Sequence, residues 1–269
     1  MSLSRLALRL AAVEALCPSA LAETGPYPTW AGNEVYDSRI TPIADASEWQ
    51  NFVAQIEGKP LLTVYTEEQE TEPTEGEYPA DKELVHLVVE LMIAAQAVVE
   101  VEGPDGQPMH IGSLEAPITS PQHEATLDML EQQIRNMLDP GSAVCPAPYS
   151  RVARELHHVK SAPVRDATDR LSRQAARTLT FKMRIARAQP YGSPSDAPAD
   201  IAGLPEPLLT VARALEPSSP AGQLVRQIAR GQPPAPILTR LNDVRIFTGL
   251  DRGETPTEAD ADLVSDARL

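Results

Sequence analysis

The sequence predicts an α+β fold, with a mainly antiparallel sheet and helices packed on one face. Segments with the two-residue period of strands occur in runs and do not alternate regularly with helices, which argues against a parallel βαβ sheet. The clearest such segment, residues 179–185, carries an apolar side chain at every second position, with Thr, Lys or Arg between them. Residues 84–93 show the same pattern with a mixed second face. We therefore expect helices to bury one face of the sheet and leave the other partly open to solvent.

The remaining elements of the N-terminal half follow in chain order. Apolar residues at helical spacing predict an amphipathic helix over residues 3–17, which Pro18 ends. This stripe argues against a signal peptide, although basic residues and a short apolar run are present. Residues 34–40 and 61–67 are typical of short strands. A GPDG turn within residues 98–111 predicts a projecting β-hairpin.

The next helix has clear signals at both ends. Ser120 precedes Pro121, which is the usual order of an N-cap and a first-turn proline. An apolar stripe over residues 127–138 follows, and Pro140 and Gly141 stop it. This helix is expected to cover the sheet.

Proline content divides the chain. Of 26 prolines, 11 follow Ile185, which indicates a partly extended C-terminal arm. We therefore predict an α/β domain over residues 1–188 and a Pro-rich extension over 189–269. The extension is expected to hold short helices at 206–215 and 220–230 and to end in a disordered acidic tail, in which residues 251–269 contain six acids and two arginines.

Few residues suggest catalysis or cofactor binding. Cys17 and Cys145 lack metal-ligand spacing and are expected to be reduced. His123-Glu124 lacks the second histidine of a zincin motif, and the adjacent His157 and His158 point apart on an extended chain. Asp166 and Asp169 fit solvated loop charges better than an acid/base pair. We expect no catalytic residues, no metal and no cofactor, and no apolar run of 18 residues suggests a membrane partner.

Charge is strongly segregated along the chain. Residues 151–187 contain ten Lys or Arg and three acids, whereas the whole chain has a net charge of −15. Residues 67–83 contain eight carboxylates and one lysine, the pattern of a solvated connection or of an acidic surface for a basic region of another copy. The basic region lacks the interleaved aromatic residues of a nucleic-acid platform. The residues expected at an interface between copies are Arg165, Arg170, Arg173, Arg177, Glu67, Glu68 and Glu70.

Four blocks together resemble the tail terminator proteins of long-tailed bacteriophages and related tail-like particles. They are GNEVYDSRITPI at residues 32–43, PLLTVYTEE at 60–68, ATLDMLEQQIRNML at 125–138 and SAPVRDATDRLSRQAARTLTFKMRI at 161–185. The resemblance covers about residues 3–187. The hairpin insertion between residues 94 and 120 and the extension after Ala188 depart from the family.

The resemblance implies a small α/β subunit that forms a ring, with six subunits expected. Such a ring caps the finished tail tube, stops its growth and joins it to the head. The implied partners are other copies of the chain, the tail tube protein and head-tail connector or neck proteins. DNA would pass through the ring without sequence recognition, and the protein would be a virion component assembled in the host cytoplasm.

Other functions stay open at the sequence level. The two departures also suit a neck or head-completion adaptor. A hydrolase with scattered carboxylates and an exported binding module are the remaining alternatives. Association with particles would separate the structural functions from the others.

Overall fold

A computed structural model describes residues 3–38, 58–71, 83–102, 108–165, 173–186 and 197–231. In the N-terminal half the elements are α1 (Leu3–Leu16), a 3-10 turn (Ser19–Leu21), β1 (Val35–Asp37), β2 (Pro60–Thr71), β3 (Glu83–Ile93), β4 (Ala95–Glu102) and β5 (Pro108–Glu115). They are followed by α3 (Pro121–Leu138), α4 (Ala147–Val152), β6 (Ala153–Arg165), β7 (Arg173–Ile185), α5 (Leu208–Ala214) and α6 (Pro220–Ala229).

The main sheet has five strands in the order β1-β2-β3-β7-β6. Only the short β1 runs parallel to its neighbour β2, and the other pairs are antiparallel, which confirms the predicted fold class. The central pair joins β3 to β7, so that Leu87 lies opposite Phe181 although 94 residues separate them. The middle of the sheet is therefore completed by a strand from late in the chain.

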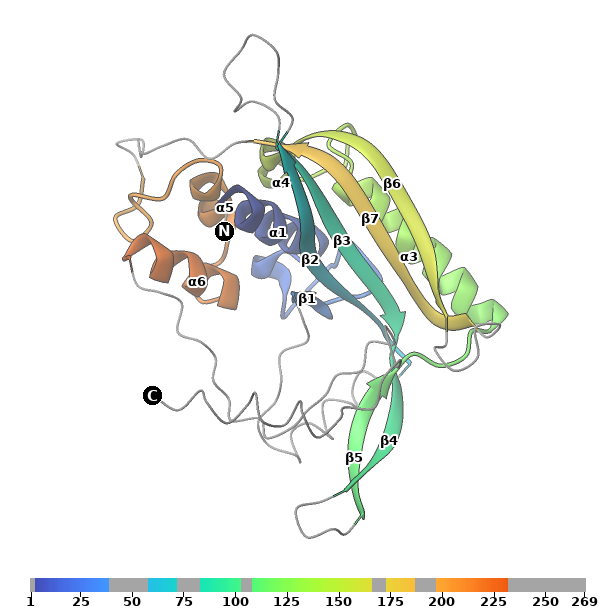
Figure 1. Ribbon diagram of the computed structural model, residues 1–269. Helices are drawn as coiled ribbons and strands as arrows, with labels where there is room; N and C mark the ends of the chain where they lie inside the picture. Colours follow the sequence, from blue (N-terminus) through green and yellow to red (C-terminus); the bar gives the residue numbers. More distant parts are fainter. Residues whose placement is uncertain are drawn as a thin grey trace, which may run out of the picture.

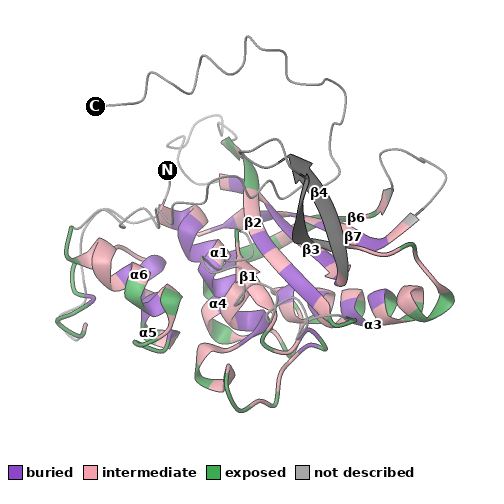
Figure 2. Cartoon of the chain, turned by 90° about the horizontal axis from the view of Figure 1, so that it is seen from below, coloured by how far each residue is buried: buried purple, intermediate pink, exposed green. Residues whose placement is uncertain are grey.

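The helices lie against one face of this sheet, as Figure 2 shows for α1, α3 and α4. Alternate residues of β3 and β7 point into this layer because strand side chains alternate between faces. Val89 and Phe181 are fully buried there together with Leu127 and Leu130 of α3. The predicted apolar stripe of α3 and the apolar face of the strand at 179–185 thus meet in one core.

The helix ends follow the sequence signals. Ser120 Oγ accepts from the backbone N–H of His123, which caps α3, and Pro121 occupies the first turn. Helix α1 ends at Leu16, just before Pro18. Both predicted boundaries are confirmed to within a residue or two.

Strands β4 and β5 form a separate two-stranded sheet. Their register runs from Ala95 opposite Glu115 to Glu102 opposite Pro108, with no interruption. Figure 1 shows this hairpin projecting from the end of β3, away from the helices. The predicted hairpin is confirmed, and its turn, residues 103–107, lies outside the described residues.

Part of the predicted C-terminal arm folds back onto the body. Helices α5 and α6 confirm the expected short helices, and Ser219 Oγ caps α6 by accepting from the N–H of Gly222. Leu208, Leu209 and Val225 are fully buried in the same cluster as α1. The division at residue 188 thus separates two parts of the chain that share one core. The predicted acidic tail, residues 251–269, lies outside the described residues.

Two elements did not emerge from the sequence. Within the basic region 151–187 the sequence predicts only the strand at 179–185, whereas the structure forms two longer paired strands there, β6 and β7. Three register irregularities interrupt β6, which weakens its two-residue pattern. Helix α4 has only six residues and begins among prolines, so its sequence resembles a loop.

Candidate interaction surfaces

The face of the sheet opposite the helices carries polar pairs that link neighbouring strands. Tyr65 in β2 donates to Glu90 in β3, with 2.8 Å between the oxygens. Lys182 Nζ in β7 lies 2.8 Å from Glu70 Oε2 in β2, and so spans β3. The ammonium group lowers the pKa of Glu70 below its ordinary value. These pairs favour one strand register over others, and the exposed Lys182–Glu70 pair contributes little stability by itself.

One group on this outer face has ligand types that bind metals. Glu68, Glu70 and His86 each place one ligand atom within 4.8 Å of the others, and Glu68 Oε2 lies 3.5 Å from His86 Nδ1. The Lys182 ammonium already pairs with Glu70, so a cation would have to displace it. Exposed carboxylates beside a lysine are typical of a surface ion-pair group, and we assign no metal to them.

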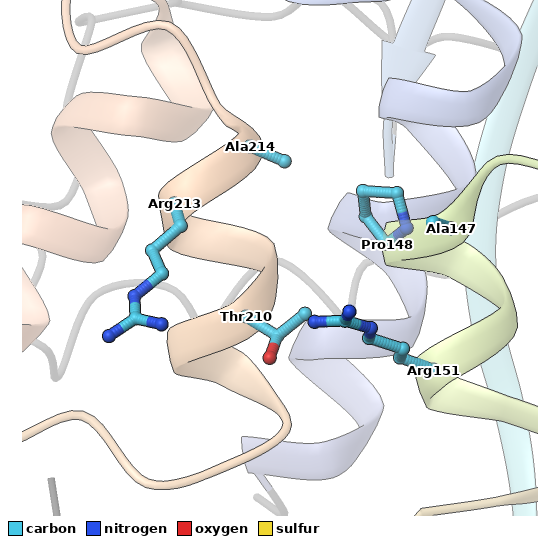
Figure 3. Close-up of a pocket in the computed structure, with 6 residues that line it drawn as sticks. All are labelled: Ala147, Pro148, Arg151, Thr210, Arg213 and Ala214. Atoms are coloured by element: carbon cyan, nitrogen blue, oxygen red, sulfur yellow. The ribbon is translucent and has the colours of Figure 1, made fainter. Parts of the chain in front are cut away.

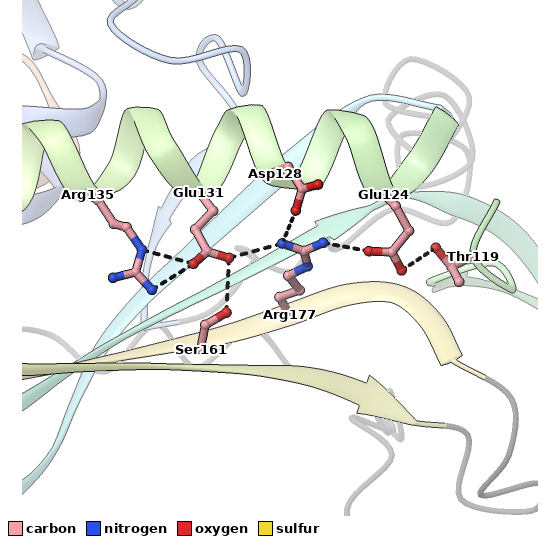
Figure 4. Close-up of polar contacts among 7 residues, drawn as sticks. All are labelled: Thr119, Glu124, Asp128, Glu131, Arg135, Ser161 and Arg177. Carbon is pink, nitrogen blue, oxygen red and sulfur yellow. Dashed lines mark hydrogen bonds and ion pairs between the residues drawn. The ribbon is translucent and has the colours of Figure 1, made fainter. Parts of the chain in front are cut away.

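Beneath the sheet, Arg177 of β7 points toward α3 and is surrounded by its carboxylates (Figure 4). Its Nη2 lies 2.5 Å from Glu124 Oε2, and its Nη1 lies 2.6 Å from Asp128 Oδ1 and 3.1 Å from Glu131 Oε2. Only 14% of the arginine side chain is exposed. We call these four residues the Arg177 cluster. It ties the covering helix to the central part of the sheet.

Two further groups fix Glu131. Arg135 donates to its Oε1 from one helical turn away, and Ser161 of β6 donates to its Oε2 at 3.0 Å. Burial raises the pKa of Glu131, but the hydrogen bonds from Arg135, Ser161 and Arg177 outweigh it, so that the pKa is lowered overall. For Arg177, burial lowers the pKa, and the carboxylates more than reverse this. Both groups are therefore held in their charged forms.

The expected interface residues lie in three places. Arg165 ends β6 directly opposite Arg173, which begins β7, so the backbone brings these two positions together at one end of a strand pair. Arg170 lies outside the described residues. Arg177 lies on the helix-covered face of the sheet, in a cluster within the same chain, which gives it a structural role, and its expected interface role stays a prediction. The acidic residues Glu67, Glu68 and Glu70 all lie on β2.

Each half of the Arg177 cluster has a signal in the sequence, although the contact between the halves does not. Arg177 continues the odd-numbered apolar face of 179–185, so the two-residue period directs it toward the helices. Residues 124, 128 and 131 are spaced along one face of a helix, where an opposing cation is expected. The expected place of Arg177 at an interface between copies is a different prediction from this contact within one chain.

A shallow pocket of about 250 Å³ lies between α4 and α5. In Figure 3, Arg151 reaches toward Thr210, whereas Arg213 points away from α4. The lining contains no carboxylate, histidine or cysteine, so the Thr210 hydroxyl has none of these general bases beside it in the pocket. The lining residues are Ala147, Pro148, Arg151, Thr210, Arg213 and Ala214.

A membrane-spanning helix must be both long and apolar. Among the described helices, none has both the length and the apolar character needed to cross a bilayer.

No protein-family model matches the chain, and no curated protein matches it with significant similarity.

Proposed function

We propose that the chain is a structural subunit of the tail terminator ring of a long-tailed bacteriophage or a related tail-like particle. In this proposal, copies of the chain form a ring, with six subunits expected, that caps the finished tail tube, stops its growth and joins it to the head. The partners are other copies, the tail tube protein and the connector or neck proteins, and DNA passes through without sequence recognition. The protein acts in the virion and not as an enzyme.

The observation that carries this proposal is the position of the four resembling blocks in the fold. They supply β1, β2, most of α3, the end of β6 and all of β7, which are parts of one sheet and of the helix covering it. Arg177 from the last block binds Asp128 and Glu131 from the third. Blocks far apart in sequence thus contribute to one layered unit, as the small α/β subunit that the resemblance implies requires.

The electrostatics of the chain also support an assembly role. A ring needs two different surfaces on each subunit that fit one another after rotation. Acidic β2 lies near one edge of the sheet, and the basic strand pair β6–β7 lies at the other. Opposite charges at opposite edges favour head-to-tail contact between copies over contact between identical edges.

The experiment that tests this function is deletion of the gene in a strain that produces the particles. Loss of a terminator is expected to give tail tubes of uncontrolled length, because nothing stops their growth. Loss of a neck or head-completion adaptor would instead leave tubes of normal length that do not join heads. Electron microscopy of the particles, with complementation by the intact gene, separates the two outcomes.

A second measurement addresses the enzyme alternative. The tagged protein is expected to sediment with intact tails, and light scattering of the purified protein is expected to give the mass of a ring under assembly conditions. Particles of normal length, attachment and composition in the deletion strain would overturn the proposal. A protein that stays entirely in the supernatant would do the same.

A further inference from the structure

Strand β6 forms one end of the five-stranded sheet, and none of the described strands pairs with its outer edge. Its register with β7 is regular from His158 opposite Lys182 to Pro163 opposite Arg177, between two irregularities. This regular stretch spans about 20 Å at the rise of a strand. A sheet edge with unpaired N–H and C=O groups is a template for another strand unless something covers or blunts it. On β6, Pro163 has no N–H to donate, so the available donors lie before it.

The hairpin β4–β5 is a second element that lacks a strand partner among the described residues. It is hydrogen-bonded within itself over eight residue pairs and to no other described strand, and it projects from the body (Figure 1). An isolated two-stranded hairpin is at best marginally stable in water and needs further strands or a packing surface. A further strand or packing surface against this hairpin would therefore add to its stability.

The two elements have opposite charge. Residues 95–115 contain four acids and neither Lys nor Arg, and the acids Glu100 and Glu102 both belong to β4. Strand β6 contains Arg154, Lys160 and Arg165 against a single acid. Arg154 and Lys160 are exposed. Pairing these strands would place acidic residues beside basic ones and would disfavour contact between two identical hairpins.

We propose that the outer edge of β6 receives strand β4 of a second copy of the chain, so that the hairpin extends the neighbour's sheet to seven strands. The donating and the receiving surfaces differ, so the contact is heterologous and repeats from copy to copy until a ring closes. The inference rests on the proposed function in one respect only: the closed ring formed by this repeated contact is taken to be the terminator ring. It gives the insertion that departs from the family a role in joining subunits.

Crosslinking between two differently tagged pools of the full-length chain tests the contact. Both pools carry Cys17→Ala and Cys145→Ser, so that each has a single introduced thiol. The edge pool carries Lys160→Cys, and the hairpin pool carries Glu100→Cys. A short bismaleimide reagent is expected to join the pools to each other and to give no dimer within either pool. The control pool carries Arg230→Cys, at the exposed end of α6, in place of Lys160→Cys, and is expected not to crosslink to the hairpin pool.

A charge exchange provides an independent readout. Arg154→Glu with Lys160→Glu is expected to weaken self-association, measured by sedimentation, by about tenfold or more. Adding Glu100→Lys and Glu102→Lys in the same chain is expected to restore it. Circular dichroism and thermal melting of each variant show whether the fold is intact, and Arg230→Glu is the matched single reversal.

The outcomes separate this inference from the proposed function. Oligomers whose edge and hairpin pools crosslink no better than the control would overturn the inference and leave the ring intact. Edge-to-hairpin crosslinks in a protein that never associates with tails would support the strand contact and overturn the terminator role. A full-length chain that remains monomeric, with no crosslinks at assembly concentrations, counts against the inference directly.

Discussion

Arg177 Nη1 in strand β7 lies 3.1 Å from Glu131 Oε2 in helix α3, across 46 residues of sequence. The same guanidinium also contacts Glu124 and Asp128. Because α3 places these three acids along one face, each lies near another of like charge, and the arginine is what makes that arrangement favourable. The orientation of the helix on the sheet therefore depends on a polar contact as well as on apolar packing.

Replacement of Arg177 by alanine is expected to lower the free energy of unfolding by about 2 to 3 kcal/mol, because three carboxylates lose their shared cation in a partly buried site. Arg135→Ala is the comparison, since it removes a more exposed donor to the same Glu131 from within the helix, a pair of a kind worth about 0.3 to 0.5 kcal/mol. Urea denaturation of both variants measures the difference. Equal effects would show that the Arg177 cluster contributes no more than a surface pair.

The cluster also predicts acid sensitivity. The folded-state pKa of Glu131 lies below its ordinary value of 4.5, so its contribution to stability is present above that value and is lost as the pH falls through the folded-state pKa. Glu131→Gln should therefore lose less stability than the wild type when the pH is lowered from 7 to 3. Unfolding curves at several pH values test this. Parallel pH profiles for the two proteins would contradict it.

Phe181→Ala is expected to cost about 3 to 5 kcal/mol, since the ring is fully buried in the layer between the sheet and the helices. Thr180→Ala, on the other face of the same strand, provides the control and should change stability by less than about 1 kcal/mol. Thermal melting distinguishes them. A neutral Phe181→Ala would mean that this side chain is not part of the core.

Two truncations should behave differently. Ending the chain after Leu250 removes most of the acidic terminus and is expected to leave the melting temperature nearly unchanged, because polar, charged residues bury little apolar area. Ending it after Ala188 removes Leu208, Leu209 and Val211, which are fully buried against the rest of the core, and should give an unstable or aggregating protein. Differential scanning calorimetry of both proteins gives the answer. A large drop on removing only residues 251–269 would mean that the terminus is docked.

Gly222→Ala tests the packing at the start of α6. Alanine in place of glycine inside a helix ordinarily stabilises by about 1 kcal/mol. At this position a Cβ atom would lie 2.1 Å from the carbonyl oxygen of Glu216, so we expect a net loss of about 1 to 3 kcal/mol. Gln223→Ala, one residue later and exposed, should be nearly neutral. Stabilisation by Gly222→Ala would show that the loop before α6 moves easily.

Local sequence patterns were sufficient to predict the elements whose spacing or capping pattern is unbroken. The alternation at 179–185 and the cap at Ser120 are such cases, and both are confirmed. Strand β6 was missed because its irregularities break the alternation that identifies a strand. The Arg177 cluster required pairing a strand face with a helix face, and that pairing depends on tertiary contacts. Nothing in residues 201–229 taken alone shows that α5 and α6 pack on α1, because short helices between prolines look the same in a free arm.

The strand order also has a consequence during synthesis. When β3 leaves the ribosome, only β2 of its two neighbours exists, and β7 follows about 80 residues later. Until then, the apolar face of β3 lacks α3, and one of its edges lacks a partner. Helix α1 is synthesised first, and its contacts with α5 cannot form until α5, near the end of the described chain, has been made. Contacts between residues so distant in sequence form slowly. In the meantime the growing chain exposes the apolar face and one unpaired edge of β3, which favour aggregation. Chaperone supply and translation rate are therefore expected to influence the yield of folded protein more than the stability of the finished protein would suggest.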